Sequence, residues 1–476
     1  MRIRPATAVW IYAAVVAVLL GYFMLDIPVQ LNDSLQNILG VRRRTMWDLV
    51  LNQFWSAGYL RPLLFAPIKL VFEASGGHYT AWFRGFHVAQ MAFTIGLFVA
   101  LLRVRTWTDA AAAPLALAAC VGLHTFAGTI REAFPINGYL TVIDCCLAAA
   151  LVAAARPRWW SVPCAVGLLI LAALTVESGL LVWVVLIAGF IAGWRGVPRW
   201  GVVLATLCVV AYFVTRFAAL NTSMPGLSER STGFGLQILE PAQIIERFGD
   251  NPWPLYAYNV GASVGSVLFA EPRAGVFWVV RDVLSRDVEP WTIVNLVACA
   301  SLTAFIIWFV ASGTERWRRW ELGHNDQLVA VFVAVLGANA VMNYVYTKDV
   351  IMSPAGVFFA LAGYAAIREC VGRLEHVSFG ALGARRAASV CLLICATAWG
   401  IKAAGVHFSL RHIARDVRME WAFVDEWQVK QEITITDPRD RAIVEVLRAD
   451  ALWRRPALPR IDIPWPWPGE WFDTSQ

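Results

Sequence analysis

Apolar segments long enough to cross a lipid bilayer recur along this chain of 476 residues, beginning with Val9 to Leu25. Most contain about 17 to 25 residues, the length that an α-helix needs to traverse the hydrocarbon core. Charged residues make up 16% of the sequence, against about 25% in typical soluble proteins, and the mean hydropathy is +0.57. We therefore expect an all-α polytopic membrane protein.

Length and hydropathy predict about eleven transmembrane helices. The predicted spans are 8–26, 79–102, 108–126, 138–155, 161–176, 178–194, 199–220, 291–312, 327–346, 350–368 and 386–407. Two apolar pieces, 61–74 and 252–270, are shorter or interrupted by Pro and Gly, and we expect them to be interfacial or re-entrant. The transmembrane module would cover 1–407, with outside loops at 27–78 and 221–290, and a small extramembrane tail would cover 408–476.

The basic residues predict how the chain is oriented. If the N-terminus is cytoplasmic, every inside loop is basic, as the positive-inside rule requires. These loops contain Arg2, Arg4, Arg103, Arg105, Arg156, Arg158, Arg195, Arg199, Arg316, Arg318, Arg319, Arg368, Arg373, Arg385 and Arg386. The net charge of +6 then reflects topology and predicts no nucleic-acid partner. We expect a bacterial inner-membrane protein with a retained first span and a periplasmic tail.

The first outside loop departs from this rule, because Asp33 is followed by three consecutive arginines, Arg42 to Arg44. Such a departure indicates that function has overridden topology. The other candidate site residues on the outside face are Tyr59, Arg61, His87, Glu132, Glu177, Lys348 and Asp349. Structural alternatives remain open: the arginines would bind anionic head groups, Glu177 would cap a helix pair, and Lys348–Asp349 would form a surface ion pair.

The tail and the cysteines are also informative. Asp437-Pro438 predicts a helix from Arg439 to Ala451, capped by the aspartate. The Trp/Pro stretch 463–468 would anchor at the membrane interface or line a sugar site. None of the nine cysteines has metal-ligand spacing, so the sequence requires no metal or other cofactor. A divalent ion held by Asp33 and Glu132 stays open.

Several short motifs resemble the GT-C superfamily of polytopic glycosyltransferases, most closely the branch with O-mannosyltransferases, including TPR-bearing ones, and their bacterial relatives. These motifs are Asp33 in the first loop, Tyr59-Leu60-Arg61-Pro62-Leu63, Phe86-His87-Val88, Leu123-His124 through Arg131-Glu132-Ala133, Thr175-Val176-Glu177-Ser178, and Tyr346 to Pro354. Asn32 stands where the family often has a second acid, and no TPR repeat follows the last span.

The resemblance implies a donor sugar linked to a polyprenyl phosphate, an outside-facing site and inversion at the anomeric carbon. Asp33 would be the general base, and Arg61, Lys348 and Arg42 to Arg44 would bind the lipid phosphate. Glu132, Glu177, His87, Asp349 and Tyr59 would orient the substrates. The acceptor would be a glycan, lipid or protein, and membrane lipids would surround the chain.

Two alternatives use the same cations. A transporter or flippase for a lipid-linked or anionic substrate would place ionisable residues near the middle of the bilayer, where Asp144 is the main candidate. A glycan ligase or polymerase would use a lipid-diphosphate donor and a large loop bearing arginines. The segment 221–290, with Arg230, Arg247 and Arg273, keeps that possibility open.

Overall fold

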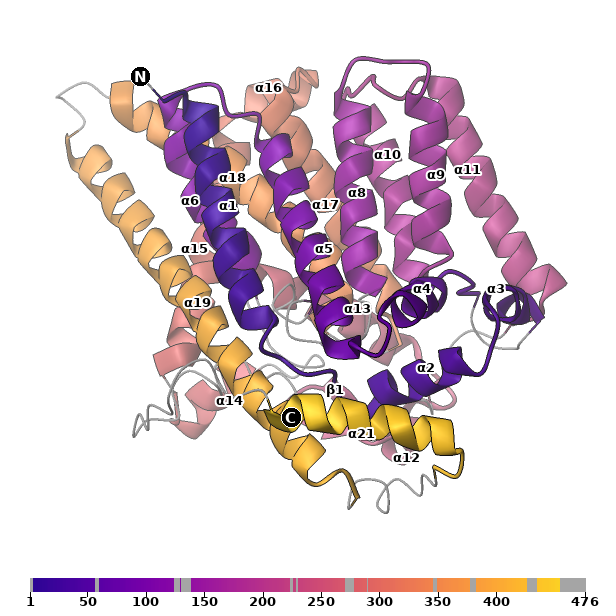
Figure 1. Cartoon of the computed structure of the whole chain (residues 1–476). Coiled ribbons are helices and arrows are strands. Elements are labelled where there is room, and N and C mark those ends of the chain that lie inside the picture. The colour runs from indigo at the N-terminus through magenta and orange to yellow at the C-terminus, as the bar shows by residue number, and fades with distance from the viewer. Residues whose placement is uncertain are drawn as a thin grey trace.

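The computed structural model describes residues 3–55, 60–123, 129, 138–222, 226–227, 230–269, 278–288, 290–345, 349–376, 382–425 and 435–453. For a few helical residues, Asp33 among them, it describes the backbone alone. This part of the chain is almost entirely helical (Figure 1). Its long apolar helices identify a multi-pass membrane protein and confirm the all-α class.

Within the described residues, seven helices are long and apolar enough to cross a membrane. They are α1 (Pro5–Met24), α5 (Tyr79–Leu102), α11 (Arg199–Phe213) with its π-helical continuation η2 (Val214–Ala219), α15 (Pro290–Ser312), α17 (His324–Met342), α18 (Ser353–His376) with the preceding 3-10 turn η3 (Asp349–Met352), and α19 (Leu382–Ala422).

The other four predicted spans correspond to shorter apolar helices, so the predicted count of eleven is not confirmed. They are α6 (Trp107–Gly122), α8 (Gly138–Ala154), α9 (Ser161–Ala173), and the 3-10 turn η1 (Glu177–Leu180) leading into α10 (Leu181–Ile191). The 13 residues of α9 extend about 20 Å, whereas the hydrocarbon core is about 30 Å thick. Hydropathy alone does not detect where a helix ends within an apolar run.

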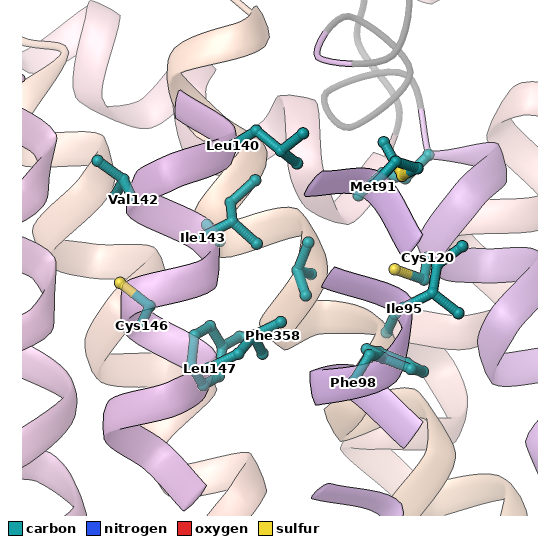
Figure 2. Close-up of a cluster of buried hydrophobic side chains, with 14 of the residues drawn as sticks. Met91, Ile95, Phe98, Cys120, Leu140, Val142, Ile143, Cys146, Leu147 and Phe358 are labelled. Atoms are coloured by element: carbon teal, nitrogen blue, oxygen red, sulfur yellow. The ribbon is translucent and has the colours of Figure 1, made fainter. Parts of the chain in front are cut away.

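The central helix of the bundle is α18, in which 94% of the most apolar stretch is buried. It packs against α6, α15 and α17. Small residues permit this close packing: a methyl group on Gly363 would lie 2.7 Å from Leu302 of α15. Figure 2 shows part of the same core, where Ile95 of α5, Ile143 of α8 and Phe358 of α18 belong to one cluster of buried side chains.

The two ends of the bundle differ in structure. At the end where α1 begins, which we call the N-terminal end, the connections are short and include α16 (Thr314–Arg319) (Figure 1). The opposite end, which we call the α2 end, has most of the extramembrane elements. These include α2 (Asn32–Arg42), α3 (Met46–Trp55), α4 (Ala66–Ala74), α12 (Pro241–Phe248), α14 (Trp278–Ser285) and the hairpin of β1 (Thr232–Phe234) and β2 (Gln237–Leu239). Helix α13 (Trp253–Phe269) packs against α15 and α17, and its Leu268 carbonyl accepts a hydrogen bond from Thr303 of α15. Helices α4 and α13 correspond to the two predicted interfacial pieces.

The tail packs back onto the bundle through α21 (Pro438–Trp453), which confirms the predicted tail helix. Its start is capped as expected, because the Arg439 N–H donates to Oδ1 of Asp437 at 2.8 Å. The boundary proposed between 407 and 408 falls inside α19, which continues to Ala422. The tail is therefore joined to the last membrane helix in two ways: α19 itself continues into it, and α21 packs against α19.

Candidate functional site

Three charged side chains meet at the α2 end of the bundle, and we call them the ion cluster. Arg61 donates to Glu177, with Nη2 at 2.6 Å and Nε at 2.9 Å from Oε2. Nη1 of Arg216 lies 3.5 Å from Oε1 of the same carboxylate. The side chains of Arg61, Glu177 and Arg216 are 28%, 21% and 7% exposed. One partly buried carboxylate therefore joins two guanidinium groups from distant parts of the sequence.

Local structure explains why these three residues meet. The Leu63 N–H donates to the Leu174 carbonyl at 3.0 Å, which ties the Arg61 segment to the end of α9. Glu177 opens η1, where the chain turns back so tightly that a methyl on Gly179 would lie 2.0 Å from the Ala172 backbone. Arg216 lies in the π-helical turn η2, a geometry frequent at functional sites.

The described part of the ion cluster consists of two guanidinium groups and one carboxylate. Arg216 also approaches the Tyr212 hydroxyl at 3.4 Å and stacks on Phe217 at 5.2 Å. Interactions between charges are less screened at such partly buried positions than in bulk water. Guanidinium groups bind phosphate through paired hydrogen bonds, so these two side chains have the chemistry that an anionic head group requires.

An apolar pocket of about 230 Å³ adjoins the ion cluster. Its walls come from α9, η1, α11 and η2, and they include Leu60, Leu180 and Tyr212, which are next to the cluster in sequence or in space. Ile170 in the wall is 44% exposed, so the pocket opens on the outer surface of the bundle. In a membrane this surface faces lipid, and a hydrocarbon chain would enter the pocket without desolvation cost.

The segment that leads into α2 is fixed by side chains from two membrane helices. Nε of Arg84 donates to the Ile27 carbonyl at 2.7 Å, and Trp421 Nε1 donates to the Val29 carbonyl at 2.6 Å. Arg418 pairs with the Asp26 carboxylate at 2.7 Å. Asp33 is the second residue of α2, and its side chain lies outside the described atoms. The structure thus fixes the backbone at this end of the bundle without giving the direction of the carboxylate.

Arg42 and Arg43 bind carboxylates of the tail helix, in a group that we call the tail clasp. Arg42 pairs with Asp437 and Asp440, and Arg43 pairs with Asp440, with its Nε 3.0 Å from Oδ2. Asp440 is fully buried, and its hydrogen bonds raise the pKa of Arg42. These partners differ from the lipid phosphate that the sequence predicted. Arg44 is exposed on the surface.

The remaining predicted residues do not form one described constellation. His87 is buried in α5, with its Nε2 3.0 Å from the Thr129 carbonyl. Tyr59, Glu132 and Lys348 lie outside the described residues, and Asp349 begins η3 with only its backbone described. The predictions for these four residues stay predictions.

The arginines of the segment 221–290 gave the ligase alternative its support. Arg247 stacks over Phe234 at 4.8 Å and over Phe248 at 5.4 Å, beside the hairpin. Arg230 lies just before β1, and Arg273 lies outside the described residues. Within the part of the chain that the structure describes, Arg247 therefore packs within the small hairpin unit.

Sequence reasoning missed Arg216 and Arg418, which hold the site or its approach. The signal was present, because an arginine inside an apolar run is functional by default and needs a partner. Arg216 lies in the predicted span 199–220, where the long run of apolar neighbours concealed it. Lys402 was missed in the same way: it is fully buried in α19, 5.0 Å from the Trp399 ring.

The described residues contain no group of three or more His, Cys, Asp or Glu side chains that could hold a metal ion. A comparison of the chain with protein-family models, curated proteins and solved structures found no match. The geometry of the ion cluster, the pocket beside it and the α2 segment is therefore the basis from which function is inferred.

Proposed function

We propose that this protein is an inverting membrane glycosyltransferase that moves one sugar from a polyprenyl-phosphate donor to an acceptor hydroxyl on the extracytoplasmic face. The observation that favours this function most is the ion cluster beside an apolar pocket. A lipid-linked phosphate needs both features: cations for its head and an apolar surface for its chain. Arg61 and Arg216 would bind the phosphate, while the first isoprene units would lie against Leu60 and Tyr212.

The reaction would be a single displacement. The acceptor oxygen attacks C1 of the sugar as Asp33 accepts the proton of the acceptor hydroxyl. The bond between C1 and the phosphate oxygen breaks on the opposite face, which inverts the anomeric centre. Its electron pair leaves with the lipid phosphate, and the arginines stabilise the developing charge. Glu177 would hold both arginines in place, which extends its predicted orienting role.

The test uses the purified full-length chain in lipid nanodiscs with radiolabelled polyprenyl-phosphate sugars and a set of candidate acceptors. We expect transfer to an acceptor, and we expect Asp33→Asn to reduce it by about 10²–10⁴-fold, the usual contribution of a general base. Asp48→Asn in α3 is the matched control, because this exposed carboxylate bonds only locally to Thr45. A folded Asp33→Asn protein with full activity would contradict the assignment.

A second candidate, a transporter for a lipid-linked or anionic substrate, is favoured by the buried ionisable residues inside the bundle. Lys402 in α19 is 1% exposed, and Asp144 in α8 is 8% exposed and accepts a hydrogen bond from Thr94 at 2.5 Å. Transporters place such groups within their membrane helices. Translocation of a labelled lipid-linked sugar in proteoliposomes, lost in Lys402→Met and retained in Asp33→Asn, would favour this candidate over transfer.

A further inference from the structure

A second groove lies at the N-terminal end of the bundle, on the side opposite the ion cluster. It encloses about 480 Å³ between α15, α18 and α19. Its apolar wall includes Phe305, Trp308, Leu374 and Ala388. Its lining residues come from the second half of α15, the end of α18 and the start of α19. These parts of the helices lie toward the N-terminal end of the bundle (Figure 1).

The charge in this groove has one sign. Arg373 and Arg385 are its charged lining residues among those described, and the lining includes no carboxylate. Arg373 is held in place by Glu369 at 2.9 Å and by Ser312 at 3.1 Å, and its guanidinium lies 5.0 Å from the Trp308 ring centre. Arg385 is exposed, and within the described chain it has no ion pair. The mouth of the groove therefore keeps a net positive charge from Arg385, while Glu369 balances Arg373.

We propose that this groove binds an anionic glycerophospholipid of the surrounding bilayer. The head-group phosphate would lie between Arg373 and Arg385, and an acyl chain would extend along Trp308 and Phe305. Basic pockets between transmembrane helices at the positive end of a bundle recognise anionic head groups. The volume is within the range of about 300–1,000 Å³ that small-ligand sites occupy. This site is independent of the proposed sugar transfer.

A neighbouring groove lacks the cations on which this proposal depends. At the same end, α10, α17 and Trp320 enclose about 250 Å³ lined by apolar residues alone. Such a groove would accept an acyl chain of any lipid, because it offers no cation to a head group. The α15–α19 groove differs in having arginines, and the substitutions described below remove them.

Cys391 provides the measurement, because it lines the α15–α19 groove and is exposed. Cys164 and Cys208 are partly exposed and the other six cysteines are buried, so Cys164→Ala with Cys208→Ala leaves Cys391 as the accessible thiol. The full-length variant is placed in nanodiscs of phosphatidylcholine alone or mixed with phosphatidylglycerol. The rate of Cys391 alkylation by a maleimide then reports how fully the groove is occupied.

We expect phosphatidylglycerol to slow alkylation of Cys391 by roughly five-fold for each arginine that contacts it, the effect of one cation at an anionic surface. Arg373→Gln with Arg385→Gln should remove the protection, whereas Arg386→Gln, next to the groove, should retain it. Arg385→Gln alone changes only an exposed side chain and keeps the test valid if the double variant fails to fold.

Three results would overturn the proposal. Equal alkylation rates in the two lipid mixtures would show that head-group charge has no effect. Protection that survives in Arg385→Gln and in the double variant would assign the effect to lipid packing. Equal protection by a polyprenyl phosphate in phosphatidylcholine would mean that the groove binds the donor lipid. The first two results would not bear on sugar transfer, which is measured separately with Asp33→Asn.

Discussion

The α2 end contains two arginine clusters that differ in their partners and surroundings. In the tail clasp, Arg42 and Arg43 face Asp437 and Asp440, so the described charges cancel. In the ion cluster, Arg61 and Arg216 share the carboxylate of Glu177 beside an apolar pocket. The clasp holds the tail helix against α2, whereas the ion cluster is where we propose that the lipid phosphate binds.

This comparison shows that closeness in sequence is a poor guide to the partner of an arginine. Arg42 to Arg44 lie nearest to Asp33 along the chain, yet two of them bind the tail. Arg61 and Arg216 are 155 positions apart in sequence and share one carboxylate. The arginines of one cluster hold a helix and those of the other lie beside an apolar pocket, and the predictions below test that difference.

Removing a charge from the ion cluster should have the largest effect. Arg61→Gln removes the guanidinium that donates to both carboxylate oxygens of Glu177. We expect transfer from a polyprenyl-phosphate sugar to fall by about 10²–10³-fold, the usual cost of losing one preorganised donor to a developing anion. The measurement is the initial rate of transfer in nanodiscs at saturating acceptor.

The matched control for Arg61→Gln is Arg43→Gln in the tail clasp. The side chain of Arg43 is 58% exposed, and Arg42 remains to pair with Asp440. We expect transfer to stay within about two-fold of the unaltered protein, since exposed ion pairs contribute little. An equal loss of activity in both variants would mean that the ion cluster has no greater part in transfer than the tail clasp.

Breaking the tail clasp should mainly affect stability. Asp440 is fully buried and binds two arginines, and Asp440→Ala would leave Arg42 partly buried with only Asp437 as its partner. Breaking a buried ion pair from one side costs about 3–5 kcal/mol. We expect α21 to detach, which limited proteolysis would detect as faster cleavage between α19 and α21. Asp425→Ala is the control, because its carboxylate is 74% exposed; equal cleavage in the two variants would contradict the role of the clasp.

Filling the pocket beside the ion cluster should have a smaller and more selective effect. Ala211 lines that pocket and is exposed on α11, so Ala211→Trp would fit on the surface and occupy the pocket. We expect the KM for the lipid-linked donor to rise roughly ten-fold while kcat is retained, the pattern of lost uniform binding. Leu207→Trp is the control, on the same helix and 58% exposed but outside the pocket. Equal KM values for the two variants would show that the pocket does not bind the donor.

Much of the fold could be predicted from the sequence, because hydrophobic length determines which segments enter a membrane. Every predicted span coincides with an apolar helix, and the Asp437-Pro438 signal gave α21 correctly. Helix ends were less predictable: the turn at Glu177 to Gly179 ends α9 early through a tight backbone approach that hydropathy does not register.

The candidate site was predicted in part. Arg61 and Glu177 were singled out separately, because each is a charge beside an apolar run, and the structure joins them. Their common partner Arg216 could not be paired from sequence, since nothing in a single chain gives the contact between α11 and the turn after α9. The tail clasp was missed for the same reason, because it connects residues almost 400 positions apart.

The smallest expected effect is the pH dependence of the tail clasp. The Arg439 N–H and then Arg42 lower the pKa of Asp437 below its ordinary value of 3.8. A lowered pKa in the folded state means that the charged carboxylate stabilises the docked tail above the ordinary value, and that this contribution is lost as the pH falls through the lowered value. Spin labels are placed at Gln36→Cys on α2 and Glu445→Cys on α21. We expect the distribution of distances between them to broaden only at pH values below about 4. Asp437→Asn removes the titrating group, so its label distances should change less over this range. Broadening that begins near neutral pH, or that is unchanged in Asp437→Asn, would show that another group controls docking of the tail.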